Sequence, residues 1–351
     1  MFICGLGTAA PPQRYTQKEC WEVFELSPLS RQLTPRSRAI VRKILTGNNG
    51  ISTRHLALDN IEQAFELTPD IMHSRFTTHA PPLATEAARS AMTDSGTSPA
   101  EIDALIISTC TGYICPGLTS YVSEQLGLRP DALSLDLVGQ GCVAAMPNLR
   151  TGEALLASGR CQRVLSVCVE VCSAALYFDN DPGVLVSACL FGDGAAAAIL
   201  SSQPNGKRKV EWKTSGSILA AEDRELLRFE QKQGMLRNIL MPQVPARASE
   251  YAASLLSDVL EKAQVEREQV TGWVLHPGGR DVLVALQKEL ALNENDVRWS
   301  ASVLREFGNL SSPSVLFVLQ TALTDSAPSG FWWMSSFGAG FSCQGALLKV
   351  E

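Results

Sequence analysis

Apolar and polar positions along the chain follow two periods, one typical of helices and one typical of strands. An apolar residue at every third or fourth position predicts an amphipathic helix, and a short continuous or alternating apolar run predicts a strand. The helical pattern covers residues 16–26, 36–46, 83–94, 118–127, 142–158, 248–264, 279–292 and 311–324. The strand pattern covers residues 102–109, 133–138, 163–170, 194–201, 208–219, 271–276, 331–336 and 342–350. This alternation predicts an α/β protein.

The order of these elements is nearly the same in the two halves of the chain. Residues 201–207, Ser-Ser-Gln-Pro-Asn-Gly-Lys, form a polar, turn-rich segment that marks the best internal boundary. We therefore expect an N-terminal half over residues 1–205 and a C-terminal half over residues 206–351. In each half a strand is followed by a helix, a short strand, a turn into a buried helix and two further strands.

Residues with reactive side chains occupy matching places in this repeat. Cys142 follows Cys110 by 32 residues, and Asn309 follows His276 by 33 residues. The repetition indicates an internal duplication. If a pseudo-two-fold axis relates the halves, the starts of the two buried helices meet at the centre, and Cys142, His276 and Asn309 converge there.

Composition limits the classes of function. The chain has 351 residues, 45% of them hydrophobic and 19% charged, which is typical of an ordinary globular protein. Its net charge is −6 and it has no basic face, so we expect small-molecule partners rather than nucleic acid or anionic membranes. No apolar run approaches the roughly 18 residues that span a bilayer, and no signal-peptide pattern is present at the N-terminus. We therefore expect a cytoplasmic protein.

The ten cysteines lie mostly within apolar, strand-like runs. This placement favours reduced, buried thiols over a disulfide framework. There is no Cys-x-x-Cys pair, and Cys161, Cys168 and Cys172 have no histidine nearby, so we expect no metal site.

Cys142 has the sequence context of an activated thiol. It follows the apolar strand predicted at residues 133–138 and lies between Gly141 and a predicted helix. A thiolate at a helix N-terminus faces unpaired N–H groups, which can lower its pKa from about 8.5 to roughly 3.5–7.5. The alternative is that Cys142 is a small buried hydrophobic residue, as most free cysteines are.

His276 and Asn309 are the candidate partners of this thiol. His276 ends an apolar strand and precedes Pro-Gly-Gly, and the other three histidines lie in polar settings, so His276 is the best candidate for a base or ion-pair partner. Asn309 begins an apolar helix, where it is either a helix cap or a donor to a developing oxyanion. The turn at residues 336–340 is suited to presenting backbone N–H groups near the same point.

Five motifs together resemble the type III polyketide synthases, the chalcone and stilbene synthase family, in the order expected over nearly the whole chain. They are Gln140-Gly-Cys142, Leu190-Phe-Gly-Asp-Gly194, His276-Pro-Gly-Gly279, Gly308-Asn-Leu-Ser-Ser312 and Gly338-Ala-Gly340. The resemblance implies a thiolase-like fold with a duplicated five-layer αβαβα arrangement. It also implies a homodimer and no cofactor other than the CoA substrates.

The same resemblance implies a reaction. Cys142, as a thiolate paired with protonated His276, takes an acyl group from an acyl-CoA starter. Malonyl-CoA then loses CO2, and His276 and Asn309 stabilise the enolate, which attacks the Cys-bound acyl group. The product is a cyclised pyrone, resorcinol or chalcone-like compound.

The resemblance also assigns residues around the substrate. Phe191 resembles the family's gatekeeper aromatic, although core packing explains it equally well, and Cys115 matches a residue that reaches across a dimer interface. No second gatekeeper is recognisable at residues 235–240, and Phe229 is a candidate to fill part of that pocket. The substrate-binding set is Phe191, Thr111, Cys115, Cys172, Ala175, Ser311, Gly278, Gly279, Gly338 and Gly340. The residues expected near the CoA phosphates are Arg42, Lys43, Arg54 and Arg280.

Two alternatives remain open. A ketoacyl synthase that initiates fatty-acid synthesis from an acyl carrier protein uses the same Cys, His and Asn, although that family usually has His-Gln-Ala-Asn instead of His-Pro-Gly-Gly. A non-condensing acyl-binding relative would keep the fold without the reaction. Dependence on carrier protein tests the first alternative, and a stable acyl-enzyme that never consumes malonyl-CoA would support the second.

Overall fold

The computed structural model describes residues 1–205, 209–325 and 327–351. Its strands are β1 Phe2–Ala9, β2 Arg14–Thr16, β3 Thr53–His55, β4 Ala104–Thr109, β5 Leu133–Val138, β6 Arg163–Glu170, β7 Gly194–Ser201, β8 Val210–Leu219, β9 Leu227–Lys232, β10 Met235–Leu240, β11 Val270–Leu275, β12 Gly330–Gly338 and β13 Ser342–Val350. Its α-helices are α1 Gln17–Leu26, α2 Pro28–Gln32, α3 Pro35–Thr46, α4 Pro69–Ser95, α5 Leu118–Leu126, α6 Ala145–Ala157, α7 Pro182–Leu190, α8 Val244–Ala263, α9 Arg280–Glu289, α10 Arg298–Phe307 and α11 Ser314–Thr324.

Strand pairing shows the duplication directly. In the N-terminal half β1 is antiparallel to β7, β7 is antiparallel to β6, and β6 is parallel to β4. In the C-terminal half β8, β13, β12 and β11 pair with the same sequence of directions. The two sets meet where β1 pairs with β8 at Phe2 and Glu211, so the strand order is β11-β12-β13-β8-β1-β7-β6-β4-β5.

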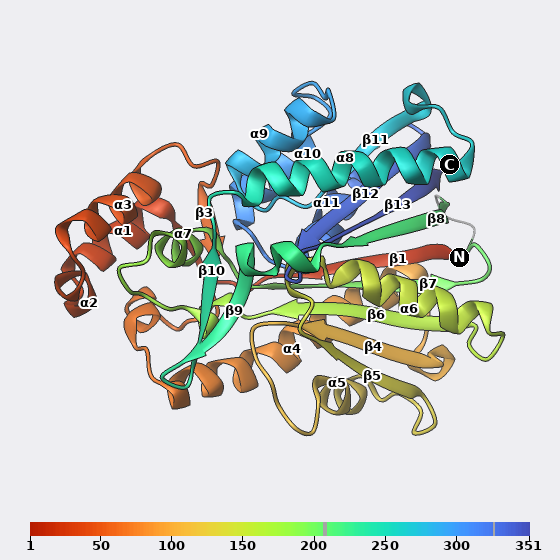
Figure 1. The fold of residues 1–351 in the computed structure, drawn as a ribbon. Coiled ribbons are helices and arrows are strands. Elements are labelled where there is room, and N and C mark those ends of the chain that lie inside the picture. The colour runs from red at the N-terminus through yellow and green to blue at the C-terminus, as the bar shows by residue number, and fades with distance from the viewer. Residues whose placement is uncertain (206–208, 326) are drawn as a thin grey trace.

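Helices divide these strands into five layers (Figure 1). The helix α4 packs on β1, β6 and β7, and α8 packs on β8, β12 and β13. Between the two strand layers, α6 contacts β4, β6 and β7 as well as β12 and β13, while α11 contacts β1, β7, β11 and β12. The predicted αβαβα arrangement of the thiolase-like fold is therefore confirmed, with α6 and α11 as its central layer.

Neighbouring residues of β12 supply two different parts of the hydrophobic core. Trp332 is fully buried among residues of the central layer, such as Leu319, whereas Trp333 is fully buried among residues of α8, such as Leu255. Successive side chains of a strand point to opposite faces, so a strand covered on both faces has a continuous apolar run. That burial explains why residues 331–334 read Phe-Trp-Trp-Met.

Most predicted elements are present, with instructive differences. Each predicted strand segment matches a strand within a few residues, except that position 208 lies outside the described residues. The helix predicted at 83–94 is only the second half of α4, which continues through Pro81 and Pro82. The second half also lacks the expected short strand before Asn309 and has α10 there instead.

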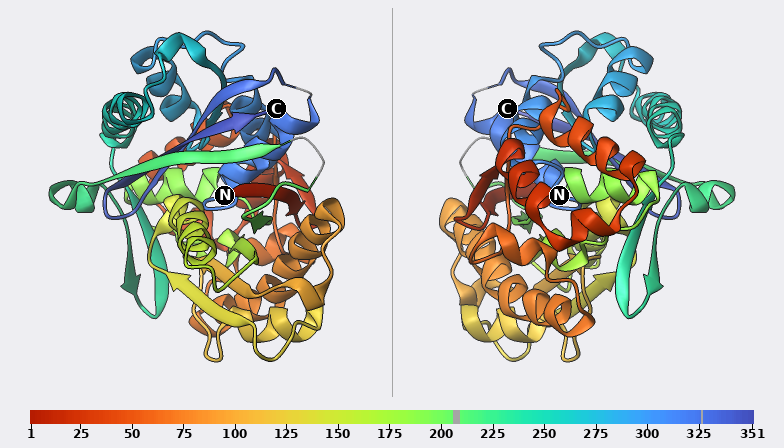
Figure 2. Two further views of the ribbon diagram at one scale, coloured as in Figure 1. Left: turned by 90° about the vertical axis from the view of Figure 1, so that its right-hand side faces the viewer. Right: turned by 90° about the vertical axis from the view of Figure 1, so that its left-hand side faces the viewer.

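The predicted boundary between the two halves lies beside residues that the structure does not describe. The predicted boundary between residues 205 and 206 borders residues 206–208, which lie outside the described residues. After β8, the hairpin of β9 and β10 projects along the side of the molecule (Figure 2). None of the helices in the described part of the chain has the length and hydropathy that a membrane span requires.

Candidate active site

Cys142 lies in a tight turn between β5 and α6. The turn is a short 3-10 helix, Gly141–Val143, and Gly141 has a φ of +60°, a conformation that favours glycine. A Cβ atom added to Gly338 would lie 2.6 Å from the Val143 nitrogen and 3.0 Å from the Cys142 nitrogen. Glycine at 338 therefore lets the end of β12 pack directly against the turn that carries the thiol.

His276 and Asn309 come from the C-terminal half. His276 follows the last residue of β11, and Asn309 lies between α10 and α11, where it forms an isolated bridge with Phe191. The Asn309 amide donates to the Gly278 carbonyl oxygen (3.1 Å), and its oxygen accepts from the Ser311 N–H (2.8 Å). The latter bond makes a local turn, and α11 begins only at Ser314, so Asn309 does not cap that helix.

These three residues line one cavity, as the duplication predicts. The cavity has a volume of about 450 Å³. Cys142 reaches it from the N-terminal half, whereas His276 and Asn309 reach it from the C-terminal half, together with the backbone of Gly278 and Gly279. We call this space the outer cavity.

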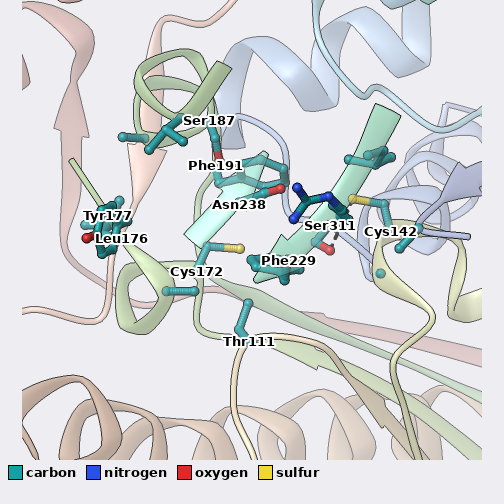
Figure 3. A pocket seen from close by; sticks show the side chains of 17 residues that line it. Thr111, Cys142, Cys172, Leu176, Tyr177, Ser187, Phe191, Phe229, Asn238 and Ser311 are labelled. Carbon is teal, nitrogen blue, oxygen red and sulfur yellow. Dashed lines mark hydrogen bonds between the residues drawn. The ribbon is translucent and has the colours of Figure 1, made fainter. Parts of the chain in front are cut away.

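A second, smaller cavity lies behind the thiol, and we call it the inner cavity (Figure 3). Its free volume is about 30 Å³, which is room for about two water-sized groups. Cys142, Phe191 and Leu227 line both cavities and therefore lie between them. The inner cavity is lined by Thr111, Gly141, Cys142, Cys172, Ala175, Leu176, Tyr177, Val184, Ser187, Ala188, Phe191, Leu227, Arg228, Phe229, Asn238, Ser311 and Ala339.

Burial favours the neutral forms of both titratable catalytic candidates. Burial raises the pKa of the Cys142 thiol from 9.0 to about 12, against the lowering effect of a hydrogen bond that the Ser311 hydroxyl donates to Sγ (3.3 Å). Burial also lowers the pKa of His276 to about 3, and neither ring nitrogen has a hydrogen-bond partner. The expectation of a lowered thiol pKa is therefore wrong for the unliganded structure, because α6 begins three residues beyond a thiol that is fully desolvated.

A buried carboxyl group is connected to this thiol through hydrogen bonds. Glu170, at the end of β6, is fully buried and accepts hydrogen bonds from the hydroxyls of Ser312 (2.6 Å) and Thr111 (2.9 Å) and from the Cys110 N–H (3.0 Å). Burial raises the pKa of Glu170, although these hydrogen bonds oppose the increase. The Cys110 thiol lies 3.3 Å from Glu170 and 3.5 Å from the Ser311 hydroxyl, so a continuous polar network reaches Cys142.

The predicted CoA-binding residues separate into two groups. Lys43 and Arg280 line the outer cavity and are exposed, and Arg280 also donates to the Asn48 carbonyl oxygen. Arg42 is exposed over the Trp21 ring and does not line that cavity.

Arg54 requires a correction. It is only 5% exposed, and its guanidinium donates to the Gln17 side chain and to the carbonyl oxygens of Ala188 and Phe191. Arg54 therefore holds α7 in place and is not available to a CoA phosphate.

The predicted pocket residues are also only partly brought together. Phe191, Thr111, Cys172, Ala175 and Ser311 line the inner cavity. Phe229 lies there too, which agrees with its expected place in the pocket.

Three other predicted pocket residues lie elsewhere. Cys115 is exposed and lines neither cavity, and the glycine turn contributes Ala339 to the inner cavity rather than Gly338 or Gly340. The prediction that Cys115, Gly338 and Gly340 line the substrate pocket is therefore corrected for this single chain.

Some residues of the site were not singled out in the sequence. Glu170 closes an apolar strand, and a carboxyl group at such a position indicates a buried polar role. Asn238 and Arg237 lie in a hairpin whose mixed polar and apolar positions gave no strand prediction. No cluster of three or more His, Cys, Asp or Glu within residues 1–205, 209–325 and 327–351 could hold a metal ion.

Comparison with known families covers almost the whole chain. The model described as "Chalcone and stilbene synthases, N-terminal domain" matches residues 2–204. The model described as "Chalcone and stilbene synthases, C-terminal domain" matches residues 222–349. The first match contains Cys142, and the second contains His276 and Asn309.

Individual proteins agree with the family comparison. A 1,3,6,8-tetrahydroxynaphthalene synthase from Streptomyces peucetius subsp. caesius is 31% identical over 355 residues, covering 99% of this chain and 92% of the relative. The crystal structure of PKS-I from the brown alga Ectocarpus siliculosus superposes with a TM-score of 0.91 at 25% identity, covering 99% and 98% of the two chains. That of 1,3,6,8-tetrahydroxynaphthalene synthase from Streptomyces coelicolor A3(2), titled a bacterial type III polyketide synthase, has a TM-score of 0.90 at 23% identity, covers 100% and 99%, and supports the fold.

Proposed function

This chain belongs to the chalcone and stilbene synthase family, the type III polyketide synthases, and we propose that Cys142, His276 and Asn309 perform its condensation reaction. The observation that carries the proposal is that these three side chains, from two halves of the chain, line one cavity of about 450 Å³. The family match does not favour a carrier-protein-dependent ketoacyl synthase or a non-condensing relative.

In the first step the acyl group moves from CoA to the enzyme. His276 accepts the thiol proton as Cys142 Sγ attacks the thioester carbonyl of an acyl-CoA. A new carbon–sulfur bond forms to Cys142, the bond to the CoA sulfur breaks, and CoA leaves as a thiol after taking the proton back from His276. Because burial opposes either charge alone, proton transfer that creates the two opposite charges together is the favourable route.

In the second step malonyl-CoA occupies the outer cavity. The Asn309 amide has two N–H donors and uses one on Gly278, so the other is available to the thioester oxygen of malonyl-CoA, as is an N–H of His276. Loss of CO2 leaves an enolate that these donors stabilise. Its carbon attacks the acyl group on Cys142, a carbon–carbon bond forms, and the thiolate of Cys142 leaves. The extended chain, now on CoA, returns to Cys142 with release of CoA, and further malonyl-CoA extends it in the same way. Ring closure of the lengthened chain then releases a pyrone, resorcinol or chalcone-like product.

The outer cavity also suits the rest of the CoA substrates. Lys43 and Arg280 supply positive charge that can meet CoA phosphates at its mouth. Phe191 lines both cavities, and in this proposal it acts as the gatekeeper that keeps water from the acyl-enzyme. No step requires a cofactor beyond acyl-CoA and malonyl-CoA.

We also propose a homodimer in the cytoplasm, organised as the halves 1–205 and 206–351. β5 is the last strand of its sheet and carries exposed apolar side chains, Leu133 (42%) and Val138 (54%). Tyr113 and Tyr121, in the segment that joins β4 to β5, are also exposed. An unprotected edge of this kind is suited to pairing with a second copy. All ten cysteines are free, which fits a reducing compartment.

The direct test is product formation from radiolabelled malonyl-CoA with short, long and aromatic acyl-CoA starters. Labelled pyrones or resorcinols should form with the wild-type enzyme and disappear with Cys142→Ala. If no starter gives a Cys142-dependent product, the proposed CoA-dependent reaction is refuted, and carrier-protein substrates become the next test.

A further inference from the structure

Asn238 is a buried amide in the wall of the inner cavity. It lies in β10, opposite Phe229 of β9, and both side chains line the cavity (Figure 3). Asn238 is only 6% exposed, and its side-chain oxygen has no hydrogen-bond partner. Buried polar groups are almost always paired, so one without a partner calls for an explanation.

The polar neighbours of Asn238 in this cavity do not satisfy it. The Thr111 hydroxyl donates to Glu170 and accepts from the Val171 N–H. The Ser311 hydroxyl donates to Cys142. Ser187 lines the same cavity, but no hydrogen bond joins it to Asn238 in the described part of the structure. Asn238, whose oxygen is unpaired, therefore lines the space that an acyl group on Cys142 would enter.

The hairpin is held so that Asn238 keeps this position. Side chains alternate along a strand, so the neighbouring Arg237 points away from the cavity. Its guanidinium contacts Asp179 (2.8 Å), Asp181 (3.1 Å) and Glu230 (2.8 Å) and is nearly buried. These contacts fix β10 against the loop before α7, and a fixed amide loses little freedom when it binds a ligand.

We propose that Asn238 recognises a hydroxyl or enol group on the acyl chain carried by Cys142. A hydroxyl both donates and accepts, so it can satisfy the amide in either orientation of its oxygen and nitrogen. The remaining free volume of about 30 Å³ requires the recognised group to lie on a compact acyl chain. This inference rests on the proposed function, since it assumes that Cys142 carries the acyl group.

The unpaired Asn238 amide should make the enzyme select acyl groups that carry a hydroxyl. A site built to bond a substrate hydroxyl discriminates strongly against an analogue without it, because the buried polar group is then left unpaired. We expect at least a tenfold preference for a hydroxylated acyl group over the same group with methyl in place of hydroxyl.

The test measures acyl loading of Cys142 by intact-protein mass spectrometry, without malonyl-CoA. Two isosteric pairs of starters differ in length: β-hydroxypropionyl-CoA against butyryl-CoA, and γ-hydroxybutyryl-CoA against pentanoyl-CoA. The variants are Asn238→Leu and the matched control Gln231→Leu, which makes the same change at an exposed position of the same hairpin.

The wild-type enzyme and Gln231→Leu should load the hydroxylated member of at least one pair tenfold faster at limiting starter concentration. Asn238→Leu should reduce that ratio at least tenfold while still loading the apolar member. Adducts formed with the same ratio in all three proteins would refute the inference alone. Absence of any Cys142 adduct would contradict the proposed function, and the inference with it.

Thermal stability provides an independent check. Replacing an unpaired buried amide with an apolar side chain of similar size should leave the Tm of the unliganded protein unchanged or raise it. A Tm several degrees below that of Gln231→Leu would show that the Asn238 amide is bonded within the protein, and this would overturn the proposal.

Discussion

At the residue scale, the main question is how a buried thiol becomes a nucleophile. Cys142 and His276 border the same cavity, and burial raises the pKa of the thiol and lowers the pKa of the imidazole. Each charge alone is therefore opposed, whereas opposite charges formed together attract each other in surroundings that screen them weakly. The reactivity of Cys142 should consequently depend on His276.

The first prediction concerns the variant His276→Ala. Without His276 no nearby base accepts the thiol proton, so alkylation of Cys142 by iodoacetamide at neutral pH should be at least about tenfold slower than in the wild type. Peptide-resolved alkylation at several pH values measures this rate for Cys142 separately from the other cysteines. His73→Ala, on an exposed position of α4, is the control and should leave the profile unchanged. Superimposable profiles for the wild type and His276→Ala would contradict the pairing.

The sequence predicted which residues meet in the cavity better than it predicted their protonation states. The motifs around Cys142, His276 and Asn309 bring the three into one cavity, as expected. Protonation depends on desolvation by residues distant in sequence, and a local pattern does not contain that information. Arg54 illustrates the same limit, because its charge suggested a phosphate contact, whereas its burial shows a structural role.

At the element scale, the hairpin of β9 and β10 forms one wall of the inner cavity and is anchored by Arg237. Burial alone would raise the pKa of Asp179, but hydrogen bonds from Arg237 and the Asp181 N–H, with the charges of Arg237 and Lys232, lower it below 3.8. A carboxyl group whose pKa is lowered on folding stabilises the protein above its unfolded pKa. That contribution is lost as the pH falls through the folded pKa.

The second prediction follows for Arg237→Met. Loss of the guanidinium should destabilise the protein by about 2 kcal/mol at neutral pH, because three carboxylates lose a nearly buried partner. The deficit should shrink as the pH falls below about 4, where Asp179 of the unfolded chain becomes protonated. Thermal unfolding of the wild type and the variant between pH 3 and pH 7 measures this loss of stability. Lys232→Met, at the exposed end of the same cluster, should cost about 0–1 kcal/mol. A deficit for Arg237→Met that is independent of pH would contradict this account.

There are physical reasons why the hydrophobic pattern of the sequence missed some helices and strands. Pro81 and Pro82 normally end a helix, yet α4 continues through both because its packing on the sheet outweighs the lost hydrogen bonds. In β1, Gly5 and Gly7 interrupt the apolar pattern, since a Cβ at Gly7 would lie 2.3 Å from the Ala87 carbonyl oxygen of α4. The glycines that allow this close approach interrupt the apolar pattern, so the hydrophobic pattern did not predict β1.

At the scale of the whole molecule, duplication explains why one site needs both halves. The duplication and the meeting of the two buried helices, α6 and α11, were predicted from the repeated order of elements, whereas the strand pairing is known only from the structure. The repeat is incomplete, because α10 replaces the counterpart of β5 in the second half. The two edges of the sheet therefore differ, since the edge strand is β5 in the N-terminal half and β11 in the C-terminal half. The edge that we propose for dimerisation is β5.

The third prediction is that Val138→Lys weakens dimerisation. A charge on this exposed edge position would be buried without a partner on pairing, so the dimer should dissociate at concentrations where the wild type stays dimeric. Size-exclusion chromatography with light scattering measures the mass. Val284→Lys introduces the same charge at an equally exposed position on α9 and should remain dimeric. Equal masses for both variants across the concentration range would exclude the β5 interface.

The central claim is that the two halves supply different parts of one reaction. The N-terminal half holds the acyl group on Cys142, and the C-terminal half stabilises the enolate through His276 and Asn309. Release of labelled CO2 from carboxyl-labelled malonyl-CoA, measured beside product formation, separates these two roles.

We predict that Cys142→Ala still releases CO2 but forms no extended product. Asn309→Ala should release CO2 about 10²–10³-fold more slowly than the wild-type enzyme. Wild-type CO2 release by Asn309→Ala, or loss of CO2 release in Cys142→Ala as complete as in Asn309→Ala, would contradict the division of roles.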